Sequence, residues 1–227
     1  MIAMEHRRVT LFAGHYGSGK TNLAVNYALF LAKEGKPVCI ADLDIVNPYF
    51  RTKDSADELE KAGVELISPQ FANSNVDLPA LPAQTYRLVE DKAIFGIMDI
   101  GGDDRGAYAL GRYVPFLKEE GQYRMVYVAN CYRPLTQTAE DTLEVMREIE
   151  SACGLSFTHI VNNSNLGNET TVETVLASVS YVQQLCSISG LPLWFHSVRE
   201  DLYPALKEDL TELFPMTLQK KYFDLPI

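Results

Sequence analysis

The chain has 227 residues, of which 47% are hydrophobic and 22% are charged, proportions typical of a globular protein with a sizeable core. No run approaches the roughly eighteen uninterrupted apolar residues of a membrane-spanning helix. The net charge is −10 and no basic run exceeds two residues. This excludes a generally basic surface, so we expect no nucleic-acid partner.

The first residues and the cysteines both predict a cytoplasmic protein. The amino-terminal segment has basic residues but no apolar stretch of the kind that a secretory signal carries. The cysteines are scattered without a C-x-x-C pair, which favours buried reduced thiols over zinc or cluster ligands, although Cys131 could bridge two chains. They are Cys39, Cys131, Cys153 and Cys186.

Seven short apolar runs rich in β-branched residues predict strands. Their character is continuous rather than alternating, which is typical of strands covered on both faces of a parallel sheet. The predicted strands are residues 8–14, 38–42, 64–68, 93–99, 124–130, 157–163 and 191–195.

Helical spacing between these runs predicts three long helices, at residues 21–35, 138–154 and 171–190. Strands that alternate with helices indicate an α/β fold with βαβ units. We therefore predict a doubly wound, mostly parallel sheet of about seven strands with helices on both faces. No repeat or linker interrupts the pattern, so residues 1–227 are predicted to form a single domain.

The segment GHYGSGKT matches the phosphate-binding pattern G-x-x-x-x-G-K-[ST] and lies between a predicted strand and a predicted helix, as that pattern requires. Lys20 is expected to reach the β- and γ-phosphates and to act in catalysis, while the Thr21 hydroxyl is expected to bind Mg²⁺. The predicted nucleotide-binding residues here are Gly14, His15, Tyr16, Gly17, Ser18, Gly19, Lys20, Thr21 and Asn22.

Carboxylates follow two other predicted strands. Asp42 and Asp44 lie in ADLDIVNP, and their spacing of two places them on one face of an extended chain. Asp99 follows the fourth strand in DIGG, whose glycines would let a main-chain N–H approach a γ-phosphate. With Thr21, these three aspartates are the predicted metal ligands. For Asp42 and Asp44, the alternative is that they are solvated residues at a strand end.

GHYGSGKT, ADLDIVNP and DIGG, in this order on successive strand ends, resemble the MinD/ParA class of P-loop NTPases. That class includes the nitrogenase iron protein, CobQ/CobB-type enzymes and dethiobiotin synthetase. The resemblance covers residues 8 to 200 and implies Mg-nucleotide binding, often in a dimer with nucleotides at the interface. By motif position, Asp44 matches the aspartate that positions the attacking water, and Asp99 matches the Walker B aspartate.

In that class an asparagine after the sixth strand contacts the base, which indicates Asn162 and then Asn163. The alternative for both is a polar transition from strand to loop. The guanine-reading patterns N-K-x-D and T-K-x-D are absent. We therefore predict ATP rather than GTP as the nucleotide.

The phosphate loop also departs from the class signature, because His15 occupies the place of the signature lysine that reaches the nucleotide of a partner subunit. His15 is shorter and only partly cationic near neutral pH. It is interpreted as a loop residue near phosphate or solvent, a weak substitute for the lysine, or part of an acceptor site. Arg51 and Arg105 are candidate replacement cations. A homodimer is implied by the resemblance, but its nucleotide-sandwich form loses this contact.

The leading functional hypothesis is a Mg-dependent ATP-binding protein, an ATPase whose hydrolysis switches its action on a protein partner. The alternative is an ATP-dependent small-molecule kinase or ligase, suggested by the loop DLPALP at residues 77–82 and by His15 and Tyr16. A third class is a binding module that retains ATP without turnover. Pro215 interrupts the tail at residues 211–223, so we expect no stable membrane association.

Overall fold

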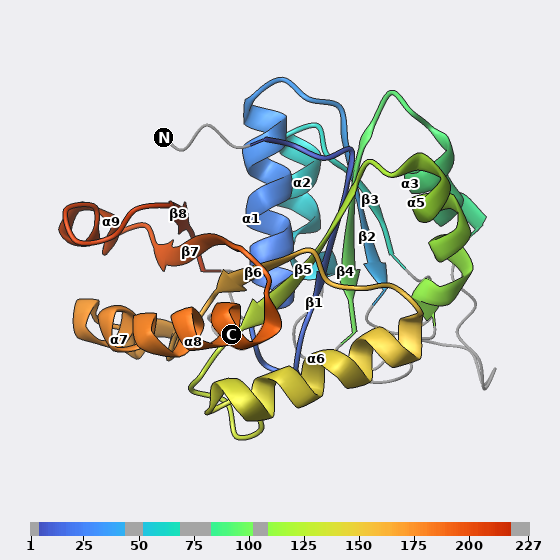
Figure 1. Ribbon diagram of the computed structural model, residues 1–227. Coiled ribbons are helices and arrows are strands. Elements are labelled where there is room, and N and C mark those ends of the chain that lie inside the picture. The colour runs from blue at the N-terminus through green and yellow to red at the C-terminus, as the bar shows by residue number, and fades with distance from the viewer. Residues whose placement is uncertain (1–4, 44–51, 69–82, 102–108, 219–227) are drawn as a thin grey trace, which may run out of the picture.

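The computed structural model describes residues 5–43, 52–68, 83–101 and 109–218, and these form an α/β fold around one sheet (Figure 1). The sheet has eight strands in the order β3-β2-β4-β1-β5-β6-β7-β8, and every pairing is parallel. The strands are β1 Val9–Ala13, β2 Val38–Leu43, β3 Glu65–Ile67, β4 Phe95–Ile100, β5 Tyr123–Ala129, β6 His159–Asn162, β7 Leu193–Arg199 and β8 Leu213–Met216. All seven predicted strands are present.

The eighth strand, β8, lies in the tail at residues 211–223, where the sequence had suggested an interrupted helix. It pairs only with β7, at the edge of the sheet. Pro215 is exposed within it. Proline cannot donate a ladder hydrogen bond, and an edge strand tolerates this because one of its sides has no partner strand. An apolar run broken by proline is therefore compatible with a strand at this place.

Helices cover both faces of the sheet, as predicted (Figure 1). On one face lie α1 and α2, and on the other lie α3, α5, α6 and α8, as their buried side chains show. The helices are α1 Lys20–Lys33, α2 Ala56–Lys61, α3 Arg87–Glu90, α5 Val114–Glu120, α6 Ala139–Cys153, α7 Val172–Ala177, α8 Val179–Ser189 and α9 Tyr203–Leu206. Short 3-10 turns are η1 Thr52–Ser55, η2 Ala83–Tyr86, η3 Gly111–Tyr113 and η4 Gly167–Glu169.

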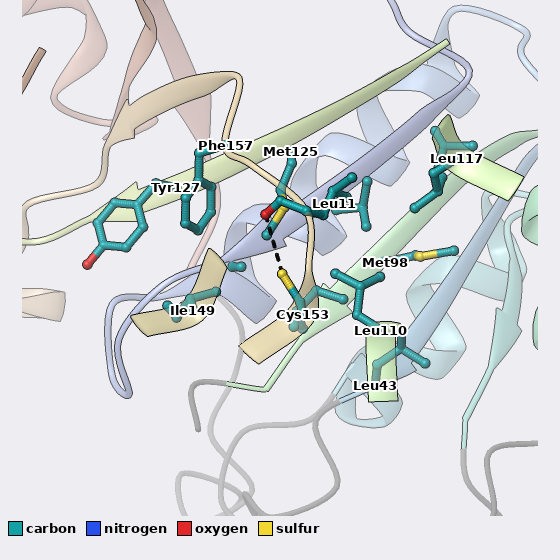
Figure 2. Close-up of a cluster of buried hydrophobic side chains, with 14 of the residues drawn as sticks. Leu11, Leu43, Met98, Leu110, Leu117, Met125, Tyr127, Ile149, Cys153 and Phe157 are labelled. Carbon is teal, nitrogen blue, oxygen red and sulfur yellow. Dashed lines mark hydrogen bonds between the residues drawn. The ribbon is translucent and has the colours of Figure 1, made fainter. Parts of the chain in front are cut away.

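Two hydrophobic cores result, one on each face, because successive strand residues point to opposite sides. The α1-side core contains Phe12, Leu23, Tyr27, Leu31, Ile40, Leu59, Ile97, Val126, Phe195 and Phe214. Figure 2 shows the α6-side core, with Leu11, Leu43, Met98, Leu110, Leu117, Met125, Tyr127, Ile149, Cys153 and Phe157. Strands buried on both faces explain the continuous apolar runs of the sequence.

The helix predicted at residues 171–190 is two helices, α7 and α8, that meet at Ser178. Ser178 is fully buried, and its Oγ donates to the carbonyl oxygen of Val175 while accepting from Nδ2 of Asn162 in β6. A serine hydroxyl that bonds nearby backbone competes with helix geometry. The apolar periodicity continues across this break, which is why the sequence pattern did not show it.

β1 lies between β4 and β5, so the strand order changes direction there. The first half of the chain extends the sheet through β4, β2 and β3, and the second half extends it through β5 to β8. In open α/β sheets, ligands bind at the carboxyl ends of the strands beside such a switch point. The segment GHYGSGKT therefore follows the strand at which the topology favours a site.

Two further expectations concern composition. All four cysteines are free thiols, and burial raises the pKa of Cys39 to about 12. Within the described ranges, no helix combines the length and apolar character needed to cross a bilayer. The assignment of residues 1–227 to a single domain stays a prediction.

Candidate functional site

The phosphate loop between β1 and α1 is a tight turn that depends on its glycines. Gly14, Gly17 and Gly19 have φ values of 154°, 75° and 90°. A Cβ on Gly14 would lie 2.7 Å from the carbonyl oxygen of Val128 in β5, and a Cβ on Gly19 would collide with the amide nitrogen of Asn163. Glycine is required at both ends because the loop passes directly against its neighbours.

The loop leads into a helix start suited to an anion. The N-cap of α1 is Gly19, which offers no side-chain hydrogen bond to the first turn. Main-chain N–H groups and the positive end of the helix dipole then favour a negatively charged ligand. Lys20 is 5% exposed, and its Nζ donates to the carbonyl oxygen of His15 at 3.2 Å. The amine is therefore folded back over the loop, where a bound phosphate would meet it.

The two residues after Lys20 have different surroundings. Thr21 is buried in the first turn of α1. Asn22 donates from Nδ2 to the sulfur of Met216 at 3.4 Å, which connects α1 to the edge strand β8. Thr21 thus lies where a hydroxyl beside the phosphate loop is needed. The nucleotide contact predicted for Asn22 stays a prediction.

The structure brings Asp42 and Asp99 together. They are register partners on the neighbouring strands β2 and β4, and Phe12 of β1 pairs with Asp99 on the other side. Such partners lie about 4.8 Å apart across a sheet. Both aspartates share the face of the α1-side core, since they are two residues beyond Ile40 and Ile97. The carboxylates therefore point to the side of the sheet that α1 covers.

Burial shows that these carboxylates belong to an organised site. Asp42 is 2% exposed and Asp99 is fully buried. Oδ2 of Asp99 accepts a hydrogen bond from Oγ1 of Thr52 at 3.2 Å. A solvated aspartate at a strand end, the alternative interpretation for Asp42, would not be buried in this way. Asp44, the third predicted carboxylate, lies outside the described residues.

The donor set fits a magnesium ion shared with a nucleotide. In the described part of the chain, no group of three or more His, Cys, Asp or Glu side chains could hold a metal by itself. Mg²⁺ is usually bound by one or two carboxylates together with phosphate oxygens and water, rather than by a full protein cage. Asp42, Asp99 and the Thr21 hydroxyl match this incomplete set. Their assignment as metal ligands stays a prediction.

The side chain of Asn163 holds the phosphate loop by a hydrogen bond to its main chain. It is 1% exposed. Its Nδ2 donates to the carbonyl oxygen of Ser18 at 2.6 Å, and its Oδ1 accepts from Oγ of Ser197 at 2.5 Å. One side chain thus connects the loop after β1 to the strand β7. A base contact by Asn163 stays a prediction, and it would have to share an amide that already holds the loop.

Asn162 belongs to a second buried network. It is 2% exposed, and its Nδ2 donates to Oγ of Ser178 at 2.8 Å and faces Nδ1 of His196 at 3.0 Å. Its Oδ1 accepts from the main-chain nitrogen of Ser164 at 3.2 Å. Burial lowers the pKa of His196, so that its ring is neutral and Nδ1 accepts the hydrogen bond. The base contact predicted for Asn162 also stays a prediction.

His15 and Tyr16 have distinct environments at the outer edge of the loop. Nδ1 of His15 lies 2.9 Å from the carbonyl oxygen of Tyr16, to which it donates. Burial lowers the pKa of His15, and the nearby Lys20 lowers it further. His15 is therefore neutral at physiological pH and supplies no permanent charge. The side chain of Tyr16 is 55% exposed. The candidate replacement cations, Arg51 and Arg105, lie outside the described residues.

Sequence reasoning missed the loop after β5, which borders the phosphate loop. Oδ1 of Asn130 accepts from the main-chain nitrogens of Tyr132 and Asn165, at 3.0 and 3.4 Å. The side chain of Arg133 in this loop lies 3.6 Å from the position that a Cβ on Gly17 would occupy. The available signal was a polar residue directly after a buried strand, the same signal that identified Asp99 and Asn162.

No protein-family model matches this chain, and no curated protein matches it by sequence. Solved structures with a similar fold do exist. Cell division protein FtsY from Thermotoga maritima has a TM-score of 0.53 and 17% identity, covering 87% of this chain and 63% of that chain. FtsY, the signal recognition particle receptor from Elizabethkingia anophelis, solved with GDP, has a TM-score of 0.51 and 16% identity, covering 87% and 59%.

A third similar structure is the signal recognition particle 54 kDa protein from Aeropyrum pernix K1 in complex with GDP. Its TM-score is 0.53 at 17% identity, covering 86% of this chain and 42% of that chain. The chain therefore spans about three fifths of the length of the two FtsY proteins and about two fifths of the third.

At these identities the comparison shows the fold, and the chain has the fold of the P-loop NTPases, with an all-parallel sheet. The sequence prediction of this fold is confirmed, with eight strands where about seven were expected. The narrower resemblance to the MinD/ParA class is not supported by these three structures, which are FtsY and signal recognition particle proteins.

Proposed function

We propose that this chain binds a Mg²⁺-nucleoside triphosphate and hydrolyses it as a switch that controls a protein partner. One observation carries the proposal: the phosphate loop is a glycine turn that leads into an uncapped helix, beside two buried carboxylates on the next strands of the sheet. A bound polyphosphate would occupy the space above this loop. In the described residues, no other helix begins directly after a turn with three such glycines.

Each residue has a role that its position supports. Lys20, held over the loop, neutralises phosphate charge, and the main-chain N–H groups of the loop surround the phosphate oxygens. Thr21 and the buried carboxylates Asp42 and Asp99 hold Mg²⁺ directly or through its water molecules. Bound magnesium would offset charge that develops on the transferred phosphoryl group. Asp44 is proposed to position the attacking water, on the motif alone.

Two observations favour different bases. The sequence lacks the guanine-reading pattern N-K-x-D, which favours ATP. Two of the similar structures, in contrast, hold GDP. The proposal is therefore a purine nucleoside triphosphate, and binding experiments need both ATP and GTP.

The partner proposal rests on where β2 and β4 end. In the sheet, β4 lies beside β1 and β2 lies beside β4, so both strands end at the same edge as the strand that leads into the phosphate loop. The segments that follow them in sequence carry Asp44 and Gly102, which lie outside the described residues. Loops that contact a γ-phosphate are released on hydrolysis, and this gives a nucleotide-dependent surface to a partner. A protein partner is proposed on this ground, without a named identity.

The test measures nucleotide binding and turnover by the purified chain. Titration calorimetry with ATP and GTP, with and without Mg²⁺, is expected to show Mg-dependent binding of one of them. Lys20→Ala should weaken binding of the triphosphate at least about 100-fold, since charge-assisted hydrogen bonds to phosphate are lost. Lys33→Ala is the matched control, because Lys33 is an exposed lysine at the other end of α1.

Absence of triphosphate binding, or equal binding by wild type and Lys20→Ala, would contradict the proposal. The kinase or ligase alternative makes a different prediction, in which release of nucleoside diphosphate requires an added hydroxyl or carboxylate metabolite. Its main sequence support, the loop at residues 77–82, lies outside the described residues. Turnover without an added acceptor would therefore favour the switch.

A further inference from the structure

Arg133 lies against the phosphate loop, although it comes from a different part of the chain. Both Cδ and Nε of Arg133 lie 3.6 Å from the position of a Cβ on Gly17. These are ordinary van der Waals distances, so the arginine passes directly beside the middle glycine of the loop. An arginine side chain extends its guanidinium beyond Nε, and the phosphate site begins at that same loop.

The turn that carries Arg133 is well braced. The main-chain nitrogen of Arg133 donates to the carbonyl oxygen of Asn130 at 3.3 Å, and the carbonyl oxygen of Arg133 accepts from the main-chain nitrogen of Thr136 at 3.1 Å. Oγ1 of Thr136 donates to the same Asn130 carbonyl at 2.8 Å. The hydroxyl of Tyr132 donates to the carbonyl oxygen of Thr174 at 2.7 Å, which fixes the turn against α7. The backbone therefore holds Arg133 beside Gly17 in a defined position.

The guanidinium of Arg133 differs from those of other partly buried arginines. Arg8 is paired with Glu120, Arg199 with Asp201, and Arg124 donates to the carbonyl of Glu5 and stacks on a tryptophan ring. Nε is buried without a hydrogen-bond partner in both Arg124 and Arg133, but Arg133 has no such compensating contact, and no ion pair involves it in the described ranges.

A buried donor without a partner is costly to the folded protein, and more so when it is charged. Such a group needs an explanation, and an anionic ligand is one. Arginine offers five donors in a fixed planar arrangement that matches phosphate oxygens. The nearest place where a phosphate is expected is the loop that Arg133 touches.

We propose that Arg133 binds the phosphate chain of the nucleotide held by the phosphate loop, and that it supplies from the same chain the permanent positive charge that His15 does not. This inference rests on the proposed nucleotide function. It adds a phosphate-binding residue from the loop after β5, outside the motif at residues 14–21. The charge is provided within one subunit, so phosphate neutralisation requires no lysine from a second copy.

The test compares Arg133→Gln with wild type in binding of the nucleoside triphosphate, diphosphate and monophosphate. Glutamine keeps much of the length and polarity but removes the charge. We expect affinity for the triphosphate to fall about tenfold to 100-fold, since a hydrogen bond to a charged group contributes about 1.5–3 kcal/mol. The loss should be smaller for the diphosphate and smallest for the monophosphate. Arg133→Lys should recover part of the affinity, because the charge returns without the planar donor set.

The folded state provides a second measurement. Without nucleotide, Arg133→Gln should keep or raise the melting temperature, because it removes a charged donor, Nε, that is buried without a hydrogen-bond partner. Arg147→Gln on the exposed face of α6 is the control and should change neither affinity nor melting temperature. A lower melting temperature together with an equal loss for all three nucleotides would mean that Arg133 only braces the loop, which overturns the inference.

The outcomes also separate this inference from the proposed function. Wild-type binding that is lost in Lys20→Ala but unchanged in Arg133→Gln would overturn the role of Arg133 and leave the nucleotide function in place. Failure of the wild-type chain to bind any triphosphate would overturn both.

Discussion

The carboxyl edge of the sheet has two halves, and their polar groups are arranged in opposite ways. At β1, β2 and β4 lie the loop glycines, Lys20 and the two buried aspartates of the candidate nucleotide site. At β6 and β7, amides, hydroxyls and a neutral histidine bond to one another in buried networks. In the proposed function the first half binds an anion, whereas the polar side chains of the second half form hydrogen bonds with one another.

This difference shows that a polar residue at the end of a buried strand can have either of two roles: it can belong to a candidate ligand site, or it can hold neighbouring segments together. Asp99 lies near the carboxyl end of the buried strand β4, and Asn163 directly follows the buried strand β6, yet Asn163 serves as a brace that fixes the phosphate loop. Its amide is shared between the phosphate loop and β7. We infer that the second half of the edge stiffens the first, and the following predictions test this division.

The largest effect is expected for Gly14→Ala, which breaks the loop itself. The new Cβ would lie 2.7 Å from the Val128 carbonyl, so backbone must shift. We expect a loss of about 2–4 kcal/mol in the free energy of unfolding, from overpacking and backbone strain. Urea denaturation followed by circular dichroism measures it. Gly35→Ala is the control, since Gly35 also has positive φ but no atom within 4 Å of its Cβ position, and it should cost about 1–2 kcal/mol. Equal costs would show that the close approach is not decisive.

The next effect is expected for Asn163→Ala, which disconnects the two halves. The substitution removes the donor to the Ser18 carbonyl and leaves the Ser197 hydroxyl with only the Asn162 carbonyl oxygen, at 3.2 Å, as its acceptor. A loss of about 1–3 kcal/mol is expected from the buried groups left unsatisfied. Nucleotide affinity should fall as well, because the loop loses its brace. Asn168→Ala, at an exposed position, serves as the control in both assays. A destabilised variant with unchanged nucleotide affinity would contradict the bracing role.

A smaller effect is expected for His196, in the second half of the edge, which makes the stability of the folded protein depend on pH. Burial lowers its pKa in the folded state, so the unfolded chain binds more protons than the folded chain below the ordinary histidine pKa near 6.5. Stability should therefore be fully present above about pH 6.5 and decline as the pH falls. His196→Gln should reduce the loss between pH 7.5 and 5.5, measured as urea midpoints. His159, whose pKa burial and Arg124 lower to about 4, and His15, whose pKa burial lowers, still contribute to the slope in the variant. An unchanged slope in the variant would exclude His196 as a contributor.

The smallest effect is expected for Tyr16→Ser at the rim of the loop. Tyr16 is 55% exposed, so its removal should change the free energy of unfolding by less than about 0.5 kcal/mol. Thermal denaturation of the nucleotide-free protein measures this. A large drop in an acceptor-dependent turnover would instead favour the kinase or ligase alternative.

Much of the fold was accessible from the sequence because its strands are buried on both faces. Seven apolar runs predicted seven strands, with boundaries that agree within a few residues. β8 was missed because an edge strand with Pro215 lacks a continuous apolar run. The break at Ser178 was missed because it depends on a hydrogen bond from Asn162, a residue of β6. Both errors concern features that partners distant in the sequence decide.

The candidate site divides in the same way. A glycine pattern between strand and helix predicts a phosphate loop locally, since positive φ and an uncapped helix start are properties of adjacent residues. Three other features depend on strand order. They are the bracing of that loop by Asn163, the burial of Asp42 beside Asp99, and the contact of Arg133 with Gly17. Parallel strands bring the ends of distant segments to one edge, and only the assembled sheet decides which of those ends are neighbours.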